Sequence, residues 1–226
     1  MDAPFPEAQL FAMAARYNAL IEPLQVLIYI PTLIVFGLLR RGTRQDTSRL
    51  VLLLLAAEWA LLGVVFFLNI VAREHWSGLV LGAVFVLSGL FYAVAAARSF
   101  PPHFHWRQDT PSYLSLLLTA VGALAYPGVG WLLGREYPNV LTYGMMPGPV
   151  ALFTLAIAVS ARPAPRLQLM LPPLLLALAS PYSLWAWHTW EDLMLLPAAV
   201  TAVGCWLAWR RKMVEAPTKD TIRFDF

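Results

Sequence analysis

The segment LVLLLLAAEWALLGVVFFLNIV, residues 50–71, decides the fold class. It contains a single ionisable side chain, Glu58, within an otherwise apolar run. A helix needs about 20 predominantly apolar residues to cross the roughly 30 Å of hydrocarbon in a bilayer. The segment therefore predicts a helix that crosses a membrane.

The rest of the chain repeats this pattern. Of its 226 residues, 59% are hydrophobic and 13% charged, whereas soluble domains carry about 25% charged residues. A soluble fold could not bury this much apolar surface. Further spans are predicted at 22–39, 78–97, 113–134, 147–161, 167–187 and 192–209, giving an all-α bundle of about seven transmembrane helices. Whether the short fifth span and the proline-containing sixth both cross fully stays open.

The basic residues predict the orientation. The chain has 16 lysine and arginine residues, and 13 of them fall in alternate loops and the C-terminal tail, on one side of the predicted membrane. Only Arg16, Arg73 and Arg135 fall on the other side. Because positive charge is retained in the cytoplasm, the N-terminus is expected outside and the C-terminus inside. The 13 are Arg40, Arg41, Arg44, Arg49, Arg98, Arg107, Arg162, Arg166, Arg210, Arg211, Lys212, Lys219 and Arg223.

This pattern divides the chain into three parts. Residues 1–21 form an outer interfacial segment, 22–211 the transmembrane domain and 212–226 a polar cytoplasmic tail. The net charge of +3 is explained by basic loops beside a membrane, so no nucleic-acid partner is expected.

Glu58 is the most informative polar residue. Counted from Leu50, it lies about 12 Å into its span at 1.5 Å per residue. An ionisable side chain at that depth is a functional hypothesis by default. Glu58 is either a proton or cation site that faces a wet cavity, or a neutral carboxyl hydrogen-bonded to another helix.

Further polar residues predict a route from the outer surface toward Glu58. Four lie on one face of the first helix, at spacings of four, three and four. Asn69 is predicted on the same face of the second span as Glu58, and Tyr126 lies in the fourth span. The alternative is hydrogen bonding between helices, which membrane bundles use routinely. The candidate path residues are Asn18, Glu22, Gln25, Tyr29, Asn69 and Tyr126, with Glu58.

A second group of polar residues gathers in the outer loops. This candidate outer cluster consists of Glu136, Tyr143, His188, Glu191 and Asp192. Its spacings match no metal-ligand pattern, so no metal and no cofactor are expected. The lone Cys205 excludes an intramolecular disulfide, and no phosphate-binding or hydrolase motif is present. The sequence gives no support for an enzyme.

Several segments resemble a family of bacterial multi-pass membrane proteins defined only as a domain of unknown function. They are RYNALIEPLQVLIYI (16–30), FFLNI (66–70), GAVFVLSGLFY (82–92), YPGVGWLLGREYPNVLTYGMMPGPVALFTLAI (126–157) and WEDLMLL (190–196). The resemblance implies a protein of the bacterial inner membrane without an established activity. Relatives often have Pro-Cys-Pro where this chain has PGP (147–149), so a thiol role does not apply. A helix N-terminus there would favour a small anionic solute.

The leading hypothesis is permease-like transport or sensing of a small solute or ion. The alternative is a non-catalytic subunit or assembly factor of a larger membrane complex. The expected partners are the lipid bilayer and either further copies of this chain or the other subunits of that complex.

Overall fold

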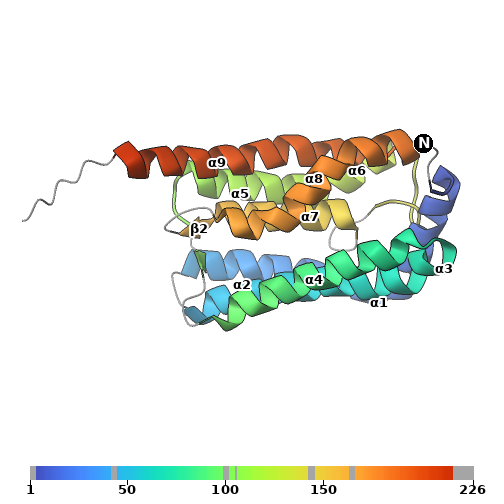
Figure 1. The fold of residues 1–226 in the computed structure, drawn as a ribbon, viewed down its shortest axis with the longest axis horizontal. Coiled ribbons are helices and arrows are strands. Elements are labelled where there is room, and N and C mark those ends of the chain that lie inside the picture. The colour runs from blue at the N-terminus through green and yellow to red at the C-terminus, as the bar shows by residue number, and fades with distance from the viewer. Residues whose placement is uncertain are drawn as a thin grey trace, which may run out of the picture.

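Seven helical segments run back and forth along one axis (Figure 1). The computed structural model describes residues 4–41, 45–98, 102–104, 106–141, 146–162 and 166–215. The segments are α1 (Glu7–Arg41); α2 (Gln45–Leu61) continued by the π-helix η1 (Leu62–Val71) and α3 (Ala72–Glu74); α4 (Ser77–Ala97); α5 (Thr110–Ala120) continued by the π-helix η2 (Val121–Ala125) and α6 (Tyr126–Leu132); α7 (Pro147–Val159); α8 (Leu167–Trp187); and the 3-10 helix η3 (Trp190–Met194) followed by α9 (Leu195–Glu215).

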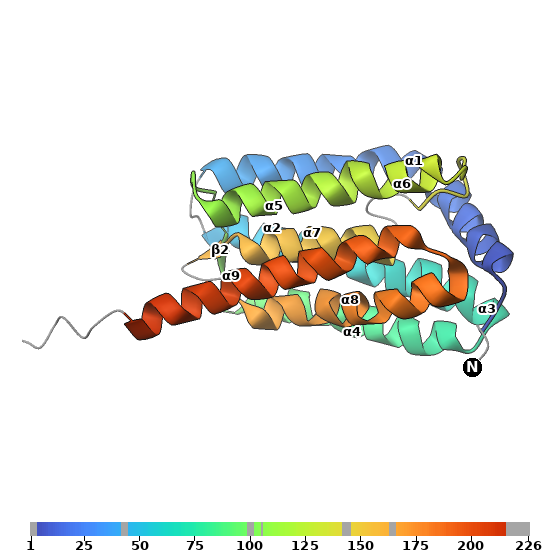
Figure 2. The same ribbon diagram turned by 90° about the horizontal axis from the view of Figure 1, so that it is seen from above.

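The two ends of the bundle differ in what they carry. The N-terminal end holds the start of α1, the α3–α4 turn and the turn before η3 (Figures 1 and 2). The C-terminal end holds the end of α9 and the strands β1 (His103–Phe104) and β2 (Ala161–Arg162), which form an antiparallel pair.

The predicted all-α class is confirmed for the described residues. The pair of two-residue strands is the one exception among them.

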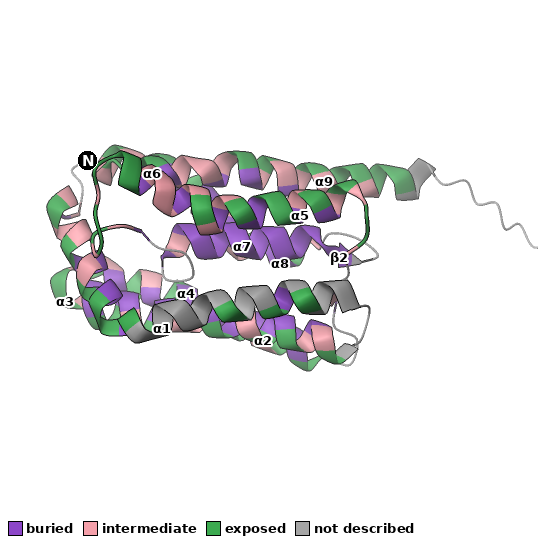
Figure 3. Ribbon diagram, turned by 180° about the vertical axis from the view of Figure 1, so that it is seen from behind, coloured by how far each residue is buried: buried purple, intermediate pink, exposed green. Residues whose placement is uncertain are grey.

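Helix α7 lies in the centre of the bundle (Figure 3). Every residue from Gly148 to Val159 is buried, and the helix packs against α5, α8 and α9. On its α2 side, Trp59 Nε1 donates a hydrogen bond to Thr154 Oγ1 at 3.0 Å. With 13 residues, α7 is only about 20 Å long. Because its residues are buried, the neighbouring helices cover it rather than lipid.

The outward faces of the other helices are apolar. Exposed side chains include Leu87 and Leu90 on α4 and Leu175 and Leu178 on α8. Among the described residues, five helices are long and apolar enough to cross a membrane. They are Asp46–Glu74, Ser77–Ala97, Thr110–Leu132, Leu167–Trp187 and Trp190–Lys212. The count of seven crossings stays a prediction.

Helix α1 runs unbroken from Glu7 to Arg41. The division into an interfacial segment ending at residue 21 and a span starting at residue 22 stays a prediction within this one helix. The side chains of residues 23–29 lie outside the described part, and those of Gln25 and Tyr29 are among them.

Two π-helical stretches alter the register of their segments. The π-helical turn η2 ends two residues before Pro127, which has no N–H to donate to the preceding turn. The π-helix η1 begins four residues after Glu58 and contains Asn69. Its wider turns rotate its side chains, including that of Asn69, relative to an α-helical count. Glu58 is buried and Asn69 exposed, so the two do not share one face as the sequence spacing predicted.

Candidate functional site

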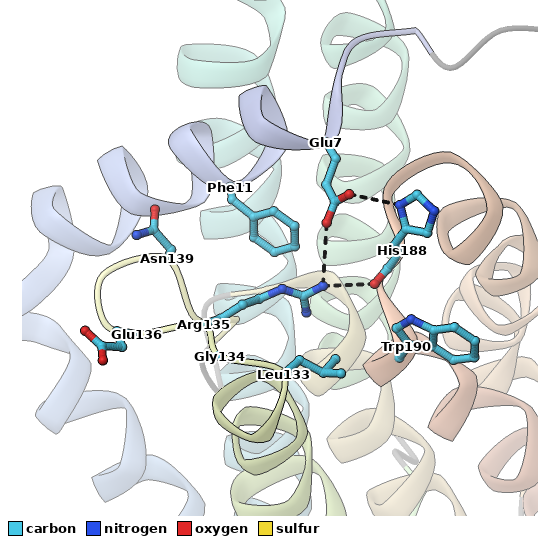
Figure 4. A pocket seen from close by; sticks show the side chains of 9 residues that line it. All are labelled: Glu7, Phe11, Leu133, Gly134, Arg135, Glu136, Asn139, His188 and Trp190. Carbon is cyan, nitrogen blue, oxygen red and sulfur yellow. Dashed lines mark hydrogen bonds and ion pairs between the residues drawn. The ribbon is translucent and has the colours of Figure 1, made fainter.

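Polar side chains from distant parts of the chain meet at the N-terminal end of the bundle. The first group, here called the Arg135 cluster, consists of Glu7, Arg135, His188 and Glu191 (Figure 4 shows the first three). Arg135 forms an ion pair with Glu191, and its guanidinium lies 4.2 Å over the Phe11 ring. It also donates to the His188 carbonyl at 2.9 Å, and a Glu7 oxygen lies 3.9 Å away. One cation thus connects α1, the loop after α6, and the turn between α8 and η3.

The Glu191 carboxylate is fully buried. Its Oε1 receives the Arg135 guanidinium, while its Oε2 has no hydrogen-bond partner among the described residues. Gly130 on α6 makes room for it, because a Cβ at that position would lie 2.9 Å from Oε1. A buried carboxylate is costly unless it is paired, and Arg135 supplies the opposite charge here.

The backbone at His188 presents the carbonyl that Arg135 uses. His188 ends α8 in the left-handed conformation, with φ 51°, and its N–H donates to the Leu184 carbonyl. This conformation is a common helix terminus. The His188 ring is exposed, and its Nδ1 lies 2.9 Å from Glu7 Oε2.

A surface pocket of about 710 Å³ adjoins this cluster (Figure 4). It is lined by Glu7, Phe11, Leu133, Gly134, Arg135, Glu136, Asn139, His188 and Trp190. Arg135, which lines this pocket, forms ion pairs with Glu191 and Glu7, so carboxylates already neutralise the charge of its guanidinium. The pocket is therefore a polar surface depression over an ion-pair network.

The second group, here called the Asp192 cluster, consists of Tyr126, Ser183, Thr189 and Asp192. Three hydroxyls donate to the Asp192 carboxylate. Tyr126 donates to Oδ1, Ser183 to Oδ2, and Thr189 to Oδ2 at 2.9 Å. Gly148, the second residue of α7, permits this arrangement, because a Cβ there would overlap the Tyr126 hydroxyl and lie 2.8 Å from Asp192 Oδ1.

The Asp192 cluster forms the polar end of a partly open cavity of about 240 Å³ between the helices. Each of the seven helical segments contributes a lining residue, and most of the wall is apolar or aromatic. The wall includes Leu10, Phe66, Phe67, Leu81, Phe85, Pro147, Leu176, Trp187 and Leu195. Phe5, before α1, also lines it; the Phe5 ring stacks on Trp187 and the Phe5 carbonyl accepts from Trp187 Nε1 at 3.0 Å.

The structure separates the residues of the predicted outer cluster. Glu191 and His188 belong to the Arg135 cluster, and Asp192 belongs to the Asp192 cluster. Glu136 is exposed at the rim of the surface pocket. Tyr143 lies outside the described residues.

The predicted path residues are also dispersed. Asn18 is buried and donates to the carbonyls of Pro138 at 2.6 Å and Val140 at 2.9 Å, so it holds the loop after α6 against α1. Glu22 is exposed. Asn69 accepts from Arg73 at 2.6 Å on the surface, and Tyr126 points to Asp192.

Glu58 is buried on α2, deep in the bundle. Neither of its carboxyl oxygens has a hydrogen-bond partner within the described part of the chain. Leu55 and Leu62, which lie on the same face of the helical segment as Glu58, are also buried.

Sequence reasoning missed Arg135, Ser183 and Thr189 as site residues. Arg135 did carry a signal, since it is one of only three basic residues predicted on the outer side. The two hydroxyl residues carried none, because serine and threonine are common in membrane helices. Among the described residues, no group of three or more His, Cys, Asp or Glu side chains is placed to hold a metal ion.

Together these observations define an all-α protein with helices long and apolar enough to cross a membrane and a polar-ended cavity at their convergence. The chain belongs to the family of unknown function DUF6064, whose model matches residues 7–216. The resemblance to a family defined only as a domain of unknown function is thereby confirmed. No curated protein and no solved structure matches the chain.

Proposed function

We propose that this chain is a multi-pass membrane protein that binds a small, mostly apolar solute in the cavity beside Asp192, as a permease or a sensor. The observation that carries the proposal is the convergence of all seven helical segments on one cavity with a single polar end. Binding sites for small molecules are typically apolar clefts with a few placed polar groups, and sites in helical bundles lie between the helices.

The proposed location is the bacterial cytoplasmic membrane, with the N-terminal end outward. The exposed apolar faces of the helices support a membrane location. Arg98 and Arg166 adjoin helix ends at the C-terminal end, and Arg49 and Arg210 lie within about two turns of such ends, which supports the direction. The cavity then lies nearer the outer surface, where a solute would enter.

The test is a comparison of small molecules that co-purify with the protein. Leu176 lines the cavity, and Leu178 on the same helix is 76% exposed and does not. Leu176→Trp fills the cavity and is expected to remove a molecule that wild type and Leu178→Trp both retain. Equal retention by Leu176→Trp, or no bound molecule in any of the three, contradicts the proposal.

A second candidate function is that of a non-catalytic subunit in a larger membrane complex. It is supported by three exposed tryptophans at or beside helix ends of the N-terminal end: Trp76, Trp131 and Trp190. Tryptophan also anchors helices at membrane interfaces. The exposed tryptophans therefore support a subunit role less strongly than the cavity supports solute binding. Loss of another protein's assembly upon deletion of this chain would favour it.

A further inference from the structure

Two neighbouring carboxylates in η3 have different partners. Glu191 is paired with Arg135, whereas Asp192 has no basic partner among the described residues and accepts hydrogen bonds from hydroxyls alone. Hydroxyls solvate a carboxylate without cancelling its charge. Asp192 therefore gives the cavity a negative end.

The Asp192 carboxylate has room for one further donor. An ionised carboxylate offers about four acceptor positions on its two oxygens. Oδ2 receives Ser183 and Thr189, but Oδ1 receives only Tyr126. Gly148 contributes no side chain beside Oδ1, where a Cβ would lie only 2.8 Å away. The unfilled position on Oδ1 suits an N–H of a ligand.

The remaining wall complements a cation with an apolar body. Of the described residues that line the cavity, Asp192 alone carries a charge. Phe66, Phe67 and Phe85 pack against one another within it, and aromatic faces attract cations. The N-terminus of α7 is a poor anion site, because Pro147 and Pro149 have no N–H and Val150 N–H is bonded to the Met146 carbonyl.

We infer that the cavity takes a small amphipathic organic cation, a primary amine whose ammonium group donates to Asp192 Oδ1 and whose apolar part lies against the aromatic wall. Aliphatic amines are protonated at neutral pH. The cavity volume of about 240 Å³ limits the ligand to a molecule below drug size. This inference rests on the proposed function and adds the chemical class of the solute.

The test compares benzylamine with benzyl alcohol, which has the same shape without the charge. Both are titrated calorimetrically into the full-length protein in lipid nanodiscs. Wild type should bind benzylamine at least about tenfold more tightly, the effect of one hydrogen bond to a charged group. Asp192→Asn should abolish this preference, while Glu136→Gln, which removes an exposed carboxylate outside the cavity, should retain it.

Benzyl alcohol guards against misfolding as the cause of a loss. Asparagine has nearly the same shape as aspartate, so Asp192→Asn should bind benzyl alcohol as tightly as wild type does while it loses the preference for the amine. Equal affinity of wild type for the two compounds, both abolished by Leu176→Trp, would overturn the inference and leave solute binding intact. Binding of neither compound would contradict the inference, and an unchanged set of co-purified molecules in Leu176→Trp would separately contradict the proposed function.

Discussion

Arg135 and Glu191 form an ion pair across 56 residues of chain, with the carboxylate fully buried and the guanidinium 13% exposed. The guanidinium also contacts the Phe11 ring and the His188 carbonyl. The pair therefore fastens three parts of the N-terminal end to one another, beside the cavity that Asp192 lines.

Arg135→Ala should destabilise the protein strongly. It leaves the Glu191 carboxylate buried without a counter-ion, which costs about 3–5 kcal/mol. Arg16→Ala is the matched control, because the Arg16–Glu74 pair is exposed and such pairs contribute about 0–1 kcal/mol. The free energy of unfolding in mixed micelles measures both. Similar losses for the two variants would show that the buried pair is not structurally important.

Gly148→Ala should disrupt the Asp192 cluster. The added Cβ would overlap the Tyr126 hydroxyl and lie 2.6 Å from Tyr126 Cζ, so the ring must move away from Asp192. Overpacking of this kind typically costs about 1–3 kcal/mol. Gly128→Ala on α6 has open space and should be neutral or stabilising by up to about 1 kcal/mol. Thermal unfolding of the two variants in one detergent compares them, and a stable Gly148→Ala protein would contradict the geometry.

Glu58→Leu should raise stability relative to Glu58→Gln. The Glu58 oxygens are buried without hydrogen-bond partners among the described residues. A buried polar group in that state costs about 1–3 kcal/mol by protein mutational data, and leucine removes the cost while glutamine keeps it. The melting temperatures of Glu58→Leu and Glu58→Gln measure this difference, and that of Glu58→Leu should be higher. A destabilised Glu58→Leu would mean that Glu58 has a partner in the native membrane.

The same residue tests the predicted path. If Glu58 is a proton or cation site for transport, Glu58→Gln should abolish accumulation of the solute while leaving its binding unchanged. Glu22→Gln, at an exposed position of α1, gives the comparison for the outer part of the path. Unchanged accumulation in both variants would remove these residues from any transport role.

The orientation can be measured by cysteine labelling. Cys205→Ala provides a background without cysteine, since Cys205 is the single one in the chain. Glu136→Cys should react with a membrane-impermeant maleimide in intact cells, because position 136 lies at the N-terminal end. Lys212→Cys should react only after the cells are opened. The opposite pattern would reverse the predicted topology.

The helical segments were predictable because apolar length is a local property. The segment 50–71 and its counterparts give spans whose bounds differ from the structure by a few residues at most sites. Helix α7 was harder, since it is short, and its central position depends on packing by α5, α8 and α9. A sequence window cannot distinguish apolar residues that face lipid from those that face protein.

The arrangement of polar residues was less predictable. Glu191 and Asp192 adjoin in sequence and were placed in one cluster, yet one pairs with Arg135 and the other with hydroxyls. Their partners come from α6, α8 and the loops, and such pairings depend on tertiary packing. Asn69 was placed beside Glu58 by α-helical spacing, which the π-helix η1 alters.

The central claim is that this chain binds a small solute in the cavity beside Asp192. The most direct measurement is native mass spectrometry of the intact particle, purified from its own membrane, for wild type and Leu176→Trp. The account predicts a particle made only of this chain, as a monomer or small homo-oligomer, with a bound small molecule that is missing from Leu176→Trp. A particle that contains other proteins and carries no small molecule would contradict it.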